Sequence, residues 1–171
     1  MRAGTSEKII TPEVGIELSG YLARMQPSTG KYDDLFARTL YLESAGKQLV
    51  WILCDLIGFS NELAWSIRNL VAKKLSIDPL YVVLSATHTH AGPATVRLRK
   101  CGDIDPAYVD FLKKIIPDCA EEAMKNAEDV SMYFSESSVD GVSIDRTNSK
   151  YSHVDKRLPV IAFKRNDGSV K

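Results

Sequence analysis

A strand, a helix and a second strand follow one another near the middle of the chain, and this order constrains the fold more than any other feature. Residues 49–55, LVWILCD, are an almost unbroken apolar run closed by an aspartate. A strand apolar on both faces belongs inside a sheet that is covered on both sides. Residues 61–75 place apolar side chains at helical spacing, and the segment LYVVLSA, residues 80–86, forms a second apolar run. We therefore expect a βαβ unit whose two strands, about 49–55 and 81–87, are parallel.

Further elements extend this unit into an α/β fold. Residues 36–54 predict an antiparallel hairpin, because an alternating segment, FARTLYLE, is followed by the turn SAGK and by the apolar run. Asp105 as a cap and Pro106 at the first helical position predict a second helix. Alternation in 130–137 and the run 158–165 predict two more strands. The expected architecture is a mixed β-sheet with flanking helices, in an incomplete domain.

Length and charge limit the classes of function. The 171 residues are enough for one domain, so we expect residues 1–171 to form a single domain. Lys plus Arg and Asp plus Glu number 22 each, which leaves no overall field to attract nucleic acid. No apolar run reaches the roughly 18 residues of a membrane span. As written the chain is expected to be soluble, with no transmembrane segment and no signal peptide. Its three cysteines are dispersed, so the fold is not expected to depend on disulfides.

The segment SATHTHAGPAT, residues 85–95, holds the strongest candidate for chemistry. His88 and His90 are two positions apart, and side chains at that spacing on a strand face the same side. Two such imidazoles suit a zinc site, or one ligand beside an acid/base or hydrogen-bonding group. The alternative is a pair of strand-end histidines with no metal. The preceding apolar strand and the Gly92-Pro93 turn favour a site.

Two more side chains are candidates for the same site. Asp55 ends one parallel strand as His88 ends the other, so both are expected at one rim, where the Asp55 carboxylate would hold a zinc-binding histidine in the right tautomer. A carboxylate that only accepts backbone N–H bonds is the competing interpretation. Arg146, in SIDRTNSKY, is able to hold a substrate oxygen, although a solvated loop arginine fits the pattern as well. His153 lies in a polar stretch and is interpreted as a loop residue.

Several stretches in order resemble the amino-terminal part of the neutral/alkaline non-lysosomal ceramidase family and its bacterial relatives. They are ITPEVGIELSGYLAR, LFARTLYLE, VWILCDLIGFS, VVLSATHTHAGPAT and IDRTNSKYSHVDKRLPVIAF, which together span most of the chain. The THTHAGP segment is the most specific of them. The sequence departs from the family pattern at Asp145, where the family commonly has Asn, and at Tyr32, where a histidine is expected.

The resemblance implies a zinc-dependent amidohydrolase that cleaves the N-acyl bond of ceramide or a related lipid amide. It implies that His88 is a zinc ligand, that His90 contacts substrate or the developing oxyanion, and that Arg146 lines the same site. The other family ligands, a second histidine, a glutamate and a tyrosine, are expected beyond residue 171. We therefore expect this chain alone to bind zinc weakly and to be inactive.

A competing hypothesis is a non-catalytic, ceramidase-like remnant or binding module that holds no metal. The resemblance also suggests a secreted or periplasmic protein whose signal is absent from this sequence, although the residues themselves specify no compartment. Sheet edges left unpaired in an incomplete domain would favour self-association.

Overall fold

The computed structural model describes residues 1–24, 26–145 and 154–171, and these residues form two compact units. The larger unit is residues 2–128, and the smaller contains Met1 and residues 129–171. The expectation of a single domain stays a prediction.

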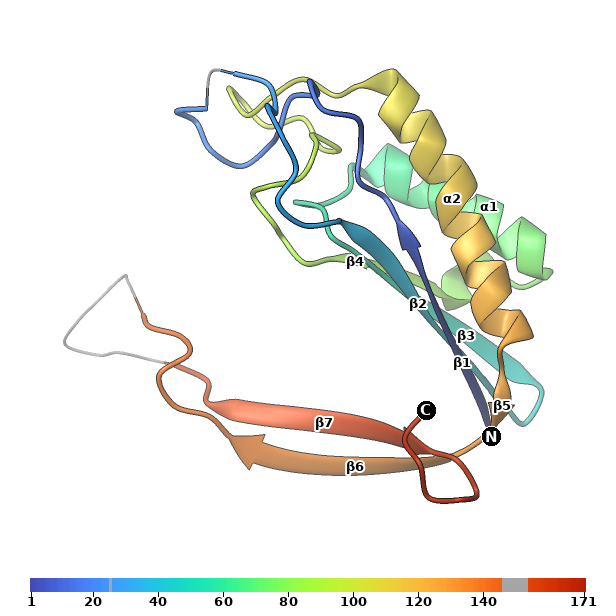
Figure 1. The fold of residues 1–171 in the computed structure, drawn as a ribbon. Coiled ribbons are helices and arrows are strands. Elements are labelled where there is room, and N and C mark those ends of the chain that lie inside the picture. Colours follow the sequence, from blue (N-terminus) through green and yellow to red (C-terminus); the bar gives the residue numbers. More distant parts are fainter. Residues whose placement is uncertain (25, 146–153) are drawn as a thin grey trace. The chain divides into compact units, whose positions relative to one another are not determined.

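A five-stranded sheet with the strand order β4-β3-β2-β1-β5 organises the larger unit (Figure 1). The strands are β1 (Arg2–Ile9), β2 (Phe36–Ser44), β3 (Lys47–Cys54), β4 (Val82–Ala86) and β5 (Glu128–Asp129). β2 pairs with β1 and with β3 in antiparallel register, whereas β3 and β4 are parallel. The predicted hairpin, the predicted parallel pair and the mixed α/β sheet are therefore confirmed.

Two helices cover one face of this sheet (Figure 1). They are α1 (Asn61–Leu75) and α2 (Pro106–Lys125), and a short 3₁₀ turn, η1 (Pro79–Tyr81), precedes β4. The Ser60 hydroxyl accepts a hydrogen bond from the Leu63 N–H at 3.2 Å, so it caps α1. The carboxylate of Asp105 accepts one from the Ala107 N–H at 2.7 Å, so it caps α2, as the sequence predicts.

The core lies between the helices and one face of the sheet. Val50, Ile52 and Cys54 of β3 are fully buried there, while Trp51 and Leu53 between them are 48% and 36% exposed. β3 thus lies inside the sheet as predicted, but the expectation that both of its faces are covered is wrong for the larger unit. The reason is that α1 and α2 pack only against the alternate residues that face them.

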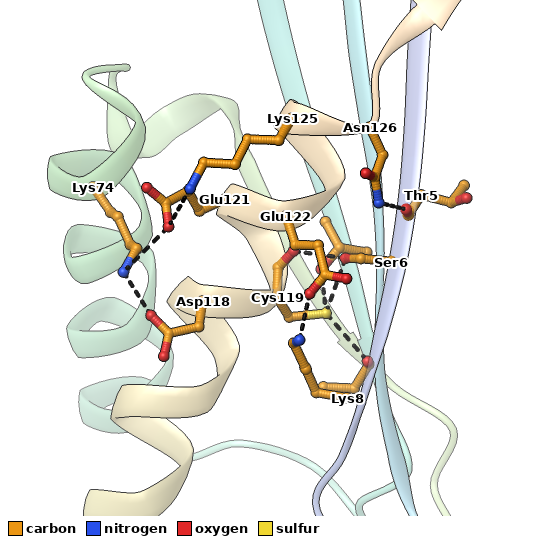
Figure 2. Close-up of polar contacts among 12 residues, drawn as sticks. Thr5, Ser6, Lys8, Lys74, Asp118, Cys119, Glu121, Glu122, Lys125 and Asn126 are labelled. Atoms are coloured by element: carbon orange, nitrogen blue, oxygen red, sulfur yellow. Dashed lines mark hydrogen bonds and ion pairs between the residues drawn. The ribbon is translucent and has the colours of Figure 1, made fainter.

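Polar contacts of α2 fix it against its neighbours, as Figure 2 shows. Lys74 of α1 forms ion pairs with Asp118 and Glu121 of α2. On the sheet side, Lys8 of β1 pairs with Glu122. The hydroxyl of Ser6 donates to the main-chain oxygen of Cys119 at 2.6 Å. These contacts hold α2 between α1 and β1.

The smaller unit contains an antiparallel pair of strands, β6 (Ser131–Ser138) and β7 (Arg157–Lys164). They match the two strands predicted at 130–137 and 158–165, and they form a sheet of their own. After β7, the Arg165 N–H donates to the Ser169 carbonyl at 2.8 Å, and Val170 bridges back to Lys164. Residues 166–169 therefore form a reversing turn.

A search of the described residues for membrane-spanning segments finds no helix with the length and apolar character that crossing a bilayer requires.

Candidate functional site

The carboxyl ends of β3 and β4 lie side by side and carry the candidate residues. Cys54 and Ala86, the last residues of the two strands, are partners in the parallel register. The Thr87 N–H then donates to the Cys54 carbonyl at 3.0 Å. Asp55 and His88 therefore leave the sheet at one edge, with no strand inserted between them. This placement agrees with the rule that sites in open α/β sheets lie beyond the carboxyl ends of parallel strands.

His88 is held by a single main-chain contact that also determines its tautomer. Its backbone has φ +63°, a left-handed conformation that is uncommon for a residue with a side chain. Its Nδ1 lies 2.8 Å from the carbonyl oxygen of Ile57. Because a carbonyl oxygen only accepts, Nδ1 must carry the proton and donate. In the neutral ring the lone pair is then on Nε2, the nitrogen available to a metal ion.

His90 faces this same nitrogen. The Nε2 atoms of His88 and His90 are 3.3 Å apart, and the two rings meet edge to face, with centroids 4.8 Å apart and planes at 76°. With the lone pair of His88 on Nε2, the proton in this contact belongs to Nε2 of His90. His90 is thus an N–H donor aimed at the position where His88 offers its lone pair.

The two imidazoles meet by a different route from the one expected. β4 ends at Ala86, and residues 87–89 are neither strand nor helix. His88 and His90 therefore do not lie on a strand, and the prediction that strand alternation turns them to the same side is wrong. The left-handed turn at His88 and the bond to Ile57 bring the rings together instead. Such a backbone conformation in a non-glycine residue is not readable from a strand-like pattern.

Asp55 follows the last residue of β3, and its side chain bonds to residues of the neighbouring strand β2. Its carboxylate accepts hydrogen bonds from the Phe36 N–H at 3.0 Å and from the Arg38 guanidinium at 2.9 Å. Within the described part of the chain, neither histidine is among its hydrogen-bonding partners. These contacts match the interpretation of Asp55 as a strand-end acceptor, and its second-shell role stays a prediction.

Gly20 and Tyr21 are neighbours of His90 that the sequence analysis did not single out. The Tyr21 ring meets the His90 ring edge-on, with centroids 5.2 Å apart and planes at 73°. A Cβ atom built on Gly20 would lie 2.4 Å from Cγ of His90. Nothing in the segment SGY, apart from a glycine before an aromatic residue, signals this contact, because the partners are 70 positions apart in the sequence.

A cavity of about 720 Å³ opens beside the histidine loop, walled mainly by residues 11–35. Thr89 and Ala91, the residues on either side of His90, are part of its lining. Tyr32, which replaces the histidine expected from the family pattern, also lines it. Arg24 and Lys31 supply positive charge among apolar walls that include Val14 and Leu18.

Ligands for a complete metal centre are not assembled in the described residues, where no group of three or more His, Cys, Asp or Glu side chains is placed to hold an ion. Arg146 and His153 lie outside the described residues. The three cysteines are unpaired by disulfides and buried, and burial raises the pKa of the Cys54 thiol. A buried thiol of raised pKa is a poor nucleophile, so Cys54 is not a candidate for nucleophilic catalysis.

Comparison with solved structures places this arrangement in a known fold. The chain matches a neutral ceramidase from Pseudomonas aeruginosa with a TM-score of 0.83 and 21% identity, over 99% of this chain and 30% of that one. It matches a ceramidase complexed with C2 with a TM-score of 0.82 and 21% identity, over 99% and 29%. No protein-family model and no curated protein matches the sequence. The chain spans about 30% of the length of these structures and has the α/β fold of that part of a neutral ceramidase.

Proposed function

We propose that His88 and His90 belong to the zinc centre of an amidohydrolase of the neutral ceramidase type, acting on the N-acyl bond of ceramide or a related lipid amide. The observation that carries the proposal is the bond between Nδ1 of His88 and the Ile57 carbonyl. It leaves Nε2 of His88 unprotonated at a sheet edge, as a zinc ligand requires, and supplies the outer-shell partner that zinc-binding histidines usually have. The shared fold supports the same assignment.

Zinc suits this donor set because it readily takes imidazole nitrogen, and when bound it polarises a carbonyl and lowers the pKa of water. His88 would hold the ion through Nε2. The further ligands are proposed to come from outside the described residues, since the chain spans 30% of the ceramidase structure that it matches.

His90 would supply a hydrogen bond to the reacting amide. In the structure its Nε2 lies 3.3 Å from Nε2 of His88, and the tautomer inferred for His88 assigns the proton of this contact to His90. A metal ion on the His88 lone pair would leave the His90 N–H without this acceptor and available to a substrate oxygen, once the rings move apart to make room for that oxygen. A fixed donor at this point stabilises negative charge as it develops on the amide oxygen. Arg146 is proposed to contribute a positive group that stabilises the same negative charge.

The cavity beside His90 is proposed to receive part of the lipid amide. It adjoins the reacting groups through Thr89 and Ala91, and it combines apolar walls with the charged side chains of Arg24, Lys31 and Asp33. Such a lining suits an amphiphile that has a polar end and a hydrocarbon chain. Ceramide is the substrate in the proposal because of the fold, and other N-acyl lipids have the same chemistry.

The experiment is expression of the whole open reading frame that contains residues 1–171, followed by an assay of fatty acid released from an N-acyl sphingosine. Release that requires zinc, and that His88→Ala lowers by at least about 100-fold, is expected, because even outer-shell partners of zinc ligands are worth 10–100-fold. Tyr81→Phe, at an exposed residue that does not line the cavity, is the control. Zinc-independent release, or unchanged release in His88→Ala, would contradict the proposal. Residues 1–171 alone are expected to lose zinc on dialysis and to release no fatty acid.

A further inference from the structure

The segment 19–21 packs directly against the imidazole of His90. We propose that Gly20 and Tyr21 are positioning residues, which hold the His90 ring where its Nε2 faces Nε2 of His88. The inference rests on the proposed function of the two histidines and adds to it the groups that determine their geometry. Neither residue has a functional group that the chemistry needs, so both act through His90.

Gly20 provides the space that the ring occupies. A Cβ at this position would lie 2.4 Å from Cγ, 2.6 Å from Cβ and 2.8 Å from Nδ1 of His90. Separations below 3.0 Å essentially never occur for a real Cβ. The obstructing atoms are the root of the side chain and not its far end, so rotation of the ring alone does not relieve the clash. Any larger residue must displace His90.

The backbone of the glycine segment has little freedom to move away. The Ser19 N–H donates to the Gly92 carbonyl at 2.9 Å. Leu18 and Pro93 form an antiparallel bridge one residue further on. Segment 18–20 is therefore tied to the same loop that carries His90, and a clash between Gly20 and His90 falls on the histidine side chain.

Tyr21 closes the other side of the ring. Its edge-on contact with His90, at a centroid distance of 5.2 Å, is an arrangement that aromatic pairs prefer. The Arg24 guanidinium lies over the Tyr21 ring, 5.0 Å from its centroid. The rings of His88, His90 and Tyr21 and this guanidinium thus form a continuous series. The contact with His90 uses the ring of Tyr21 and not its hydroxyl, so Phe is expected to replace it.

Gly15 offers a matched control for Gly20. The two glycines have nearly the same positive φ, +105° and +108°, which strains a residue with a Cβ at either position. A Cβ on Gly15 meets nothing within 4 Å. Gly15→Ala therefore reproduces the strain of Gly20→Ala without the contact with His90.

The test is a long-range ¹H–¹⁵N spectrum of the imidazoles in the zinc-free chain at a pH where the rings are neutral. The chain has only three histidines, so each ring can be assigned by substitution. Gly20→Ala is expected to shift the His90 ring signals and the Nε2 signal of His88, and to leave the His153 ring unchanged. Gly15→Ala is expected to leave all three unchanged. Wild-type signals of His90 in folded Gly20→Ala would overturn the proposal.

If Gly20→Ala fails to fold, two variants of Tyr21 test the positioning of His90 instead. Tyr21→Phe is expected to keep the His90 signals, and Tyr21→Ala to shift them through loss of the neighbouring ring. Equal spectra for the two variants would overturn the role of Tyr21. These readouts involve neither zinc nor hydrolysis. A chain that shows the shifts but never binds zinc would contradict the proposed function alone, whereas zinc binding without the shifts would contradict the positioning role alone.

Discussion

The imidazole of His88 presents its Nε2 atom to Nε2 of His90 at 3.3 Å, while its Nδ1 atom is bonded to the main chain at Ile57. One ring is thereby fixed by the backbone, and the second ring is placed against it. The pair has one proton between two facing nitrogens when both rings are neutral. This relationship supports the proposed roles, in which His88 offers a lone pair to a metal ion and His90 offers an N–H to a substrate.

The first prediction is the tautomer of each ring in the metal-free chain. His88 is expected to carry its proton on Nδ1 and His90 on Nε2, because Ile57 offers only an acceptor and His88 then has a free lone pair on Nε2. Nitrogen-15 chemical shifts of the two rings measure this directly. Protonation of Nε2 in neutral His88 would remove the basis for its role as a ligand.

The Asp34 carboxylate accepts hydrogen bonds from Thr11 and Lys31 and so joins the two ends of the segment that carries Gly20 and Tyr21. The free energy of unfolding of the chain should therefore depend on pH. Hydrogen bonds from Lys31 and from Thr11 hold the pKa of this carboxyl below its ordinary value of 3.8. A lowered pKa in the folded state stabilises the fold above pH 3.8, and this contribution is lost as the pH falls through the folded-state pKa.

Asp34→Asn should therefore unfold more easily than the wild type at pH 7, and the difference should vanish below the folded-state pKa. Urea unfolding at a series of pH values measures it. Asp33→Asn, at the exposed neighbour, is the control. A difference that persists unchanged into strong acid would show that the carboxylate charge is not responsible.

Tyr108 joins α2 to the end of β1, and its hydroxyl is expected to matter for stability. It donates to the Ile10 carbonyl at 2.7 Å in a buried position. Tyr108→Phe leaves this buried acceptor unpaired and should lower the free energy of unfolding by about 1–3 kcal/mol. Urea titration followed by circular dichroism measures the loss. Tyr81→Phe, at a residue that is 46% exposed, should change little.

An exposed apolar side chain on an end strand should promote self-association of the chain. β4 stands at one end of the five-stranded order, and Val83 within it is 42% exposed. A charged residue on an end strand discourages pairing between sheets. Val83→Lys should therefore reduce the association that light scattering detects at rising concentration, and Leu80→Lys, in η1 outside the sheet, should not. Equal scattering from both variants would place the contact elsewhere.

The fold was more predictable from sequence than the site. Residues 49–54 and 81–86 combine apolar character with a helical segment between them, and these local patterns suffice for two parallel strands. The cap at Asp105 and the proline after it likewise determine where α2 begins. Patterns of this kind are short-range, which is why they are readable without coordinates.

The site depends on contacts between distant segments. The pairing of His90 with Gly20 joins residues 70 positions apart, and the bond of His88 to Ile57 depends on a left-handed residue in a loop. The exposure of Trp51 was also missed, because an apolar strand does not reveal which of its faces is covered. Long-range packing of this kind leaves no periodic signal in the sequence.

Coordination of zinc by Nε2 of His88 is tested most directly by a zinc titration of residues 1–171 followed through the imidazole nitrogen signals. Added zinc is expected to shift Nε2 of His88 first, a chelator to reverse the shift, and His88→Ala to abolish zinc binding. Zinc that leaves the His88 signals unmoved, or that His88→Ala binds with unchanged affinity, would contradict this coordination.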